Sequence, residues 1–179
     1  MNISRLSTWH PMPSSASFRI CYWLKNRGSL THLIKQHCKD FHVKLVSQSL
    51  ATVYKDELAV MGLRRGELAL VREVHLYCGE TPVVFAHSII VKKDLRGAWR
   101  KLNGLGNRSL GATLFNDPMV RRTSIRFKKI NSSHPLFNRA CTNLQTMPLS
   151  LWARRSLFNL HGQSILVTEI FLPPILDFS

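Results

Sequence analysis

Residues 68–82 read LALVREVHLYCGETP, and their apolar side chains recur with the period of two that is typical of a β-strand. One face of the predicted strand holds Leu68, Leu70, Arg72, Val74 and Leu76, and the other holds Ala69, Val71, Glu73, His75 and Tyr77. Gly79 and Pro82 indicate a turn into a second apolar run at residues 83–91. This part of the sequence therefore predicts a β-hairpin.

Arg72 is the exception in a row of otherwise apolar side chains. A guanidinium group stays protonated, and burying it without a partner costs roughly several kcal/mol. The last predicted strand has a matching exception, because Glu169 shares a face with Ile165, Val167 and Phe171. We expect each of these two charges to have a partner of opposite or complementary chemistry.

Two interpretations of Arg72 and Glu169 remain open at this point. They could pair with each other in the core, since buried charges are usually paired. Alternatively both could face one cavity, where Arg72 holds a ligand carboxylate with a bidentate fork and Glu169 meets a hydroxyl or ether oxygen. A carboxyl in apolar surroundings tends to have a raised pKa, which would suit Glu169 to sharing a proton with a ligand.

Working outward from the hairpin, the remaining segments predict short helices and further hairpin strands. The predicted helical segments are 18–26, 29–38 with Ser29 as N-cap, 92–102, and 109–115 with Ser109 as N-cap. The predicted strands outside the first hairpin are 41–54, 119–130, 149–160 and 164–172. Residues 1–17 predict an irregular arm, 55–66 a polar crossing segment, and 131–147 a loop-rich excursion with one helical turn.

About six strands in hairpin order indicate one antiparallel sheet, because hairpins join antiparallel neighbours. The fold class that we predict is α+β, with helices on one face of the sheet. Residues 1–179 are long enough for one well-buried domain and short for two. The helices predicted at 18–26 and 29–38 would form a helical hairpin that lies over the sheet as a lobe.

Composition narrows the class of protein further. The sequence has no run of 18 or more apolar residues and no recognisable secretory signal, so we expect a cytoplasmic protein without a membrane span. Its four cysteines form no CxxC pair, so we expect reduced thiols. His32, His37, His42 and Cys38 share no helical face, so we expect no metal site.

The chain has 25 Lys and Arg against 10 Asp and Glu, a net charge of +15. Such a surface attracts nucleic acid, acidic lipid or a small dicarboxylate. RNA-reading signatures and a helix-turn-helix are absent from the sequence, so we expect a solvated basic surface and no specific nucleic-acid binding. The absence of Walker, GxGxxG and Ser–His–Asp patterns argues against kinase, nucleotide-cofactor and hydrolase chemistry.

Two weaker signals also concern anions. The start of the helix predicted after Ser109 could present backbone N–H groups, including that of Leu110, to an anion. Arg154 and Arg155 are consecutive on a predicted strand, so one of them must point inward. The inward arginine could be a second anion contact, or a partner for Glu73 or Asp117.

Three blocks of the sequence resemble the bacterial chorismate pyruvate-lyase family. They are LVREVHLYCGETPVVFAHSII at 70–90, KLNGLGNRSLGATLF at 101–115 and SLWARRSLFNLHGQSILVTEIFLP at 150–173. Their order and intervals fit over residues 7–173, and the W-x-R-R-S and L-x-T-E-x-F-L-P patterns of the last block are specific. The resemblance implies a monomer with a six-stranded sheet and two helical-hairpin lobes that close over a buried site.

The same resemblance implies a reaction and a set of site residues. Chorismate would be converted to 4-hydroxybenzoate and pyruvate, at the entry to ubiquinone synthesis, without a metal or cofactor. Arg72 would hold the ring carboxylate and Glu169 would lie near the ring hydroxyl, as the catalytic pair. Leu110 would contribute its backbone amide to substrate binding. Leu30 stands where the family usually has Met, so its contact would be through the backbone.

Two alternatives to an active lyase come from the same fold. The effector-binding domains of one large group of bacterial transcription regulators resemble it, and their R-x-x-x-x-x-x-G-x-P hairpin is similar to residues 72–82. Such regulators place a DNA-binding domain before the effector domain, and only about 40 residues precede the first predicted strand here. The second alternative is a lyase-like protein that has lost its activity.

Overall fold

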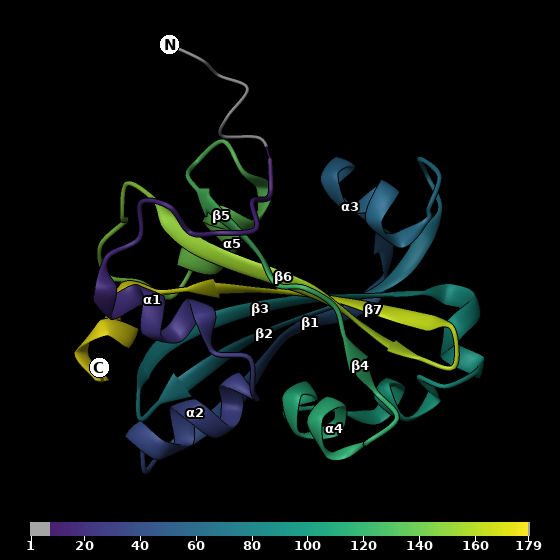
Figure 1. The fold of residues 1–179 in the computed structure, drawn as a ribbon, viewed down its shortest axis with the longest axis horizontal. Coiled ribbons are helices and arrows are strands. Elements are labelled where there is room, and N and C mark those ends of the chain that lie inside the picture. The colour runs from purple at the N-terminus through teal and green to yellow at the C-terminus, as the bar shows by residue number, and fades with distance from the viewer. Residues whose placement is uncertain (1–7, 179) are drawn as a thin grey trace.

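The computed structural model describes residues 8–178, apart from the side chain of residue 103. Within them, seven strands form one antiparallel sheet in the order β1-β2-β3-β7-β6-β4, and β5 also pairs with β6 (Figure 1). The strands are β1 (Phe41–Thr52), β2 (Leu68–Cys78), β3 (Thr81–Val91), β4 (Arg121–Arg122), β5 (Arg126–Ile130), β6 (Leu151–Leu160) and β7 (Gln163–Phe171). The predicted α+β class and the antiparallel hairpins are therefore confirmed.

Helices cover both faces of this sheet (Figure 1). One face is covered by α1 (Phe18–Lys25), α2 (Leu30–His37), α4 (Leu110–Asn116) and the 3-10 helices η2 (Lys92–Arg96) and η3 (Arg100–Gly104). The other face is covered by α3 (Lys55–Met61) and α5 (Pro135–Cys141), and η4 (Pro173–Phe178) follows β7. The prediction of helices on one face was therefore incomplete.

The alternation within β2 explains how the sheet acquires two apolar faces. Leu70, Val74 and Leu76 pack in clusters with α1, α2, η3 and α4. Ala69, on the opposite face, packs with Met61 of α3 in a separate cluster. Because successive side chains of a strand point to opposite faces, both layers of helices are built on the same set of strands.

Three segments differ from the sequence prediction. Residues 55–66 contain α3, whose first turn is stabilised because the Glu57 carboxylate accepts a hydrogen bond from the Tyr54 N–H at 2.9 Å. Residues 92–102 form 3-10 turns interrupted at Gly97 rather than one α-helix. The strand predicted at 119–130 is divided into β4 and β5 by residues 123–125.

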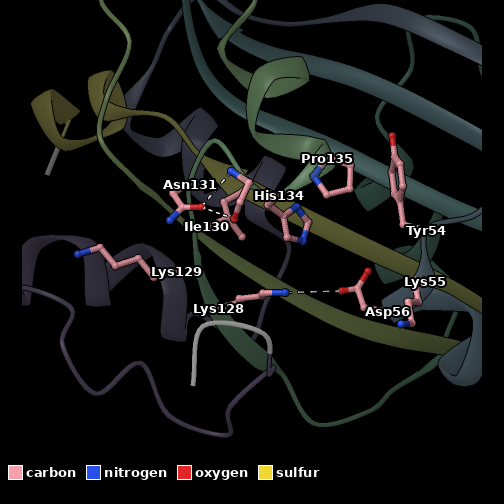
Figure 2. Close-up of a pocket in the computed structure, with 10 residues that line it drawn as sticks. Tyr54, Lys55, Asp56, Lys128, Lys129, Ile130, Asn131, His134 and Pro135 are labelled. Atoms are coloured by element: carbon pink, nitrogen blue, oxygen red, sulfur yellow. Dashed lines mark hydrogen bonds and ion pairs between the residues drawn. The ribbon is translucent and has the colours of Figure 1, made fainter. Parts of the chain in front are cut away.

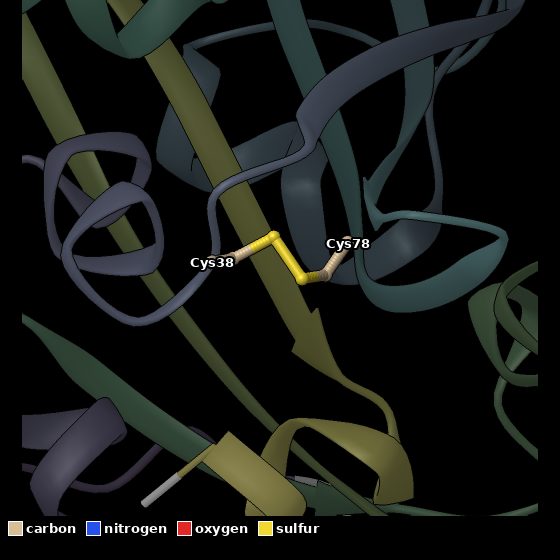
Figure 3. The surroundings of a disulfide bond; sticks show 2 residues. All are labelled: Cys38 and Cys78. Atoms are coloured by element: carbon tan, nitrogen blue, oxygen red, sulfur yellow. A yellow bond between two sulfur atoms is a disulfide. The ribbon is translucent and has the colours of Figure 1, made fainter.

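The prediction that all four cysteines are reduced is wrong in this structure, because Cys38 and Cys78 form a disulfide (Figure 3). Cys38 follows the last residue of α2 and Cys78 is the last residue of β2, so the bond fastens the helical lobe to the sheet. Cys21 and Cys141 remain free thiols. The physical reason for the error is that the two partners are 40 residues apart and meet only through the fold.

Among the described residues, no helix combines the length and the apolar character needed to cross a membrane. The N-terminal arm lies partly outside the described residues, but His10 pairs with Phe127 through an isolated β-bridge. The arm thus contacts β5 near the first residue of that strand.

Candidate active site

A cavity lies between the sheet and the helices α2 and α4. Its wall contains all four residues that the sequence singled out, namely Leu30, Arg72, Leu110 and Glu169. The remaining lining residues are Thr31, Val43, Val74, Leu76, Ala86, Ser88, Ser109, Gly111, Leu114, Phe115, Phe158 and Val167. The cavity volume is about 40 Å³, well below the roughly 300–1,000 Å³ of small-molecule sites, so the surrounding side chains nearly fill the cavity in this structure.

Arg72 is buried at 5% exposure and has no acidic partner among the described residues. Its Nη2 donates to the backbone carbonyls of Gly106 at 3.0 Å and Arg108 at 2.9 Å. Its Nε is buried and has no hydrogen-bond partner within residues 8–178. Burial lowers the pKa of the Arg72 guanidinium from its ordinary value. The structure thus contains a buried cation, held in place by a loop, that lacks an anion.

Glu169 is half-buried and lies on the same face of the sheet as Arg72. Its Oε2 accepts a hydrogen bond from Arg154 Nε at 2.5 Å and lies 3.9 Å from Arg122 Nη2. Arg72 and Glu169 do not pair with each other, so the first of the two interpretations is wrong for this structure. Both side chains line the cavity instead.

The strand register sets the span between these two charges. Arg72 lies opposite Ser88 on β3, Ser88 lies opposite Val167 on β7, and Glu169 is two residues further along β7. Strand spacings of about 4.8 Å and a rise of about 3.3 Å per residue place the two Cα atoms roughly 12 Å apart. The two charged residues thus lie on the same face of the sheet with one strand between them.

Leu30 and Leu110 are the first residues of α2 and α4, and both are buried. The two helix starts touch, because Thr31 Oγ1 and Ser109 Oγ are 2.7 Å apart. Ser109 is the N-cap by position, but its hydroxyl bonds Thr31 rather than capping α4 as predicted. A Cβ on Gly111 would lie 3.1 Å from Thr31 Oγ1, so glycine permits this close approach of the lobes over the cavity.

The two consecutive arginines of β6 have partners that the sequence did not predict. Arg154 points toward the cavity face and pairs with Glu169, while Arg155 points to the opposite face and bonds Asp56 at 3.2 Å. Neither arginine contacts Glu73 or Asp117, so that part of the prediction was wrong. The alternation of β6 against Glu169 on the paired strand was the available signal for Arg154.

A second, open cleft lies on the opposite face of the sheet (Figure 2). Its carboxylate already has partners, because Asp56 lies 4.0 Å from Lys128 and accepts a hydrogen bond from Trp9 at 2.8 Å. Burial and the positive charge of Lys128 lower the pKa of His134 to about 4. The one carboxylate that lines this cleft is therefore already paired, and the cleft's other cations, Lys55 and Lys129, are exposed to solvent, unlike the buried Arg72.

Within the described residues, no group of three or more His, Cys, Asp and Glu side chains is arranged to hold a metal ion. The polar groups of the cavity are the cation Arg72, the carboxylate of Glu169, hydroxyl groups and backbone amides. This set suits recognition of an organic acid with a hydroxyl group.

The family model for chorismate lyase matches residues 5–178. The chain belongs to the chorismate lyase family. A relative from Nitrosospira multiformis named probable chorismate pyruvate-lyase is 67% identical over 180 residues, covering 100% of both chains. A relative of the same name from Nitrosomonas europaea is 57% identical, covering 98% of this chain and 98% of its own. Another from Aromatoleum aromaticum is 45% identical, covering 95% of this chain and 94% of its own. The resemblance seen in the sequence is thus confirmed.

The chorismate lyase family member described here shares its fold with effector domains of transcription regulators. The effector domain of PhnF from Mycobacterium smegmatis superposes with a TM-score of 0.58 at 14% identity, covering 83% of this chain and 90% of that chain. The ligand-binding domain of a GntR-family regulator from Bordetella bronchiseptica gives 0.53 at 15% identity, covering 74% and 84%. At these identities the likeness concerns the fold alone.

Proposed function

We propose that this protein is a chorismate pyruvate-lyase that forms 4-hydroxybenzoate and pyruvate, with the cavity between the sheet and α2–α4 as its active site. The observation that carries the proposal is the buried Arg72, whose Nε has no partner within residues 8–178 and whose side chain lines the cavity. A ring carboxylate would supply the missing anion through charge-assisted hydrogen bonds.

The reaction needs little from the protein because the driving force is internal to the substrate. The bond between the ring carbon and the enolpyruvyl oxygen breaks, and the hydrogen on the neighbouring hydroxyl-bearing carbon leaves as a proton. The ring becomes aromatic, and the released enolpyruvate takes up a proton to become pyruvate. The site must therefore orient the ring, exclude water and help to move a proton.

Each sequence-derived residue has a role in this proposal. Arg72 would hold the ring carboxylate, and Glu169, across the cavity, would meet the ring hydroxyl and assist proton movement. Leu110 would contribute its backbone amide, and Leu30 would contact the substrate through its backbone from the start of α2. The supply of ubiquinone synthesis, a monomeric state and a cytoplasmic location remain predictions from the sequence.

The alternative functions are an effector-binding domain and an inactive relative. The fold shared with the PhnF effector domain keeps the first alternative in view. The unpartnered Arg72 serves a binding protein as well as an enzyme, but the placement of Glu169 across the same cavity favours the lyase. Incubating the purified protein with chorismate and following the absorbance of 4-hydroxybenzoate distinguishes the lyase from both alternatives.

Arg72→Ala tests the proposed clamp. Removing one partner of a charge-assisted hydrogen bond in a desolvated site costs about 2–5 kcal/mol, and about 1.4 kcal/mol is a factor of ten in rate. We therefore expect kcat/KM for chorismate to fall about 100-fold or more. Arg65→Ala, which removes an exposed arginine before β2, is the matched control and should keep full activity. Unchanged turnover in a folded Arg72→Ala variant would show that the clamp assignment is wrong.

A further inference from the structure

Arg154 joins the carboxylate of the site to the helical lobe that covers it. Its side chain is fully buried at 0% exposure, and its Nε donates to Glu169 Oε2 at 2.5 Å. Its Nη1 lies within hydrogen-bond distance of three backbone carbonyls, those of Trp23 at 3.0 Å, Leu24 at 3.1 Å and Asn26 at 2.7 Å. One guanidinium group therefore contacts β7 and the end of α1 together.

The position of these carbonyls explains why the contact matters. The last carbonyls of a helix have no partner inside the helix, and a cation at that end also interacts favourably with the helix dipole. Asn26 is the C-cap of α1, and the chain runs from it through three residues into α2. Leu30 and Thr31 at the start of α2 line the cavity. Arg154 thus links the carboxylate of Glu169 to the part of the lobe that closes the site.

Arg122 makes a second connection of the same kind. Its Nη1 donates to the carbonyl of Arg27 at 3.1 Å, its Nε donates to Ser156 Oγ at 2.7 Å, and its Nη2 lies 3.9 Å from Glu169 Oε2. Arg154 and Arg122 thus both lie close to Oε2 of Glu169, and both donate to backbone carbonyls at the end of α1 or just after it. No group within residues 8–178 is bonded to Oε1 of Glu169, which leaves that oxygen for a ligand.

We propose that Arg154, supported by Arg122, is a positioning residue that couples the orientation of the Glu169 carboxylate to the closed position of the α1–α2 lobe. If the lobe lifts, the carbonyls of residues 23, 24 and 26 move away from the Arg154 guanidinium. Arg154 is then free to shift, and it no longer keeps Oε2 of Glu169 in one position. Substrate enclosure and alignment of the acid–base group then occur together. This coupling rests on the proposed function of the cavity for its catalytic meaning, but its structural part is independent of that function.

Arg154→Lys tests the coupling because a single ammonium group cannot reach the carboxylate and three carbonyls at once. We expect amide hydrogen exchange of residues 26–34 in the ligand-free protein to become about tenfold faster. We also expect kcat for chorismate to fall about tenfold or more, since small displacements of a catalytic group are costly. The control is Arg155→Lys, an equally conservative change on the same strand whose side chain contacts Asp56 on the other face.

The two readouts separate the possible failures. Lobe exchange in Arg154→Lys that matches Arg155→Lys overturns the coupling, whatever the turnover. A wild-type protein without chorismate turnover overturns the proposed function, whereas faster lobe exchange in Arg154→Lys would still support the structural coupling. If Arg154→Lys does not fold, Arg122→Lys takes its place, because Arg122 lies closer to the surface. Wild-type lobe exchange in that variant would overturn the proposal.

Discussion

At the scale of single residues, the two charges that interrupt apolar rows have opposite surroundings. Among the described residues, the Arg72 side chain donates hydrogen bonds to two backbone carbonyls and lacks an anion, whereas Glu169 already has an ion pair with Arg154. A ligand that enters the cavity would therefore be held mainly by the cation. It would be oriented at its other end by a carboxylate whose position the protein has fixed beforehand.

Glu169→Gln asks whether that carboxylate moves a proton or only orients the ring. The amide cannot accept a proton, and general acid–base catalysis typically contributes about 10²–10⁴-fold. We therefore expect kcat at saturating chorismate to fall about 100-fold or more. Glu80→Gln, at an exposed turn between β2 and β3, is the control and should leave kcat unchanged. A near-normal rate in Glu169→Gln would exclude obligatory proton transfer by this residue and leave the orienting role.

At the scale of elements, the disulfide determines how firmly α2 is held to the sheet. Closing a loop between partners 40 residues apart removes chain entropy from the unfolded state, worth about 4 kcal/mol in the simplest treatment. We expect Cys38→Ser, and also reduction of the wild type by dithiothreitol, to lower the free energy of unfolding by up to that amount. Urea titration with and without reductant measures both. Identical wild-type curves would mean that the two thiols are reduced in solution.

The elements also show what the sequence could and could not predict. The hairpin at residues 68–91 and the two faces of β2 followed from the alternation of apolar residues, because a sheet with two covered faces fixes the register. The helix α3 was missed although Glu57 and Gly62 provide recognisable start and stop signals. Arg154 was noticed only as one of two candidates. Its partners include backbone carbonyls about 130 positions away, and no local pattern encodes such a contact.

At the scale of the whole molecule, the excess of positive charge is concentrated at the surface. The chain has 10 acidic residues, and several are used inside the fold. Glu57, Glu73 and Asp94 are buried, and Asp56 and Glu169 are half-buried. The buried cations Arg72, Lys128, Arg154 and Arg155 offset these buried acids, so the surface carries an excess of positive charge close to the net charge of +15. Such a field steers small anions toward the protein, and added salt weakens it.

A buried charge network connects the sheet to the helices on the face opposite the cavity. His87 of β3 lies 3.0 Å from Glu73 of β2 and 3.2 Å from Glu57 of α3, and Arg139 of α5 bonds Glu73 at 2.8 Å. Burial alone would lower the pKa of His87, but the neighbouring carboxylates of Glu57 and Glu73 outweigh it and raise the pKa to about 9. Burial would raise the pKa of Glu73, but the bonds from His87 and Arg139 lower it to about 2.

This network predicts how the stability of the molecule depends on pH. Because the pKa of His87 is higher in the folded state than its ordinary 6.5, its contribution is fully present below pH 6.5. One pKa unit corresponds to about 1.4 kcal/mol, so the contribution is on the order of 3 kcal/mol. It is lost as the pH rises toward about 9. Glu73 acts in the opposite direction, and its contribution is lost as the pH falls from 4.5 toward about 2.

His87→Gln isolates the alkaline part of this dependence, because glutamine keeps a hydrogen-bond donor between the two carboxylates but does not titrate. We expect the variant to be less stable than the wild type at pH 6, and the difference to shrink steadily between pH 6.5 and about 9. His134, whose pKa is lowered to about 4, is present in both proteins, so its titration cancels in the difference between them. Urea unfolding at half-unit pH intervals measures the effect. If His87 is charged in the folded state, it loses its proton in this range and the two stability curves converge. Parallel curves above pH 6.5 would therefore show that His87 is not charged in the folded state.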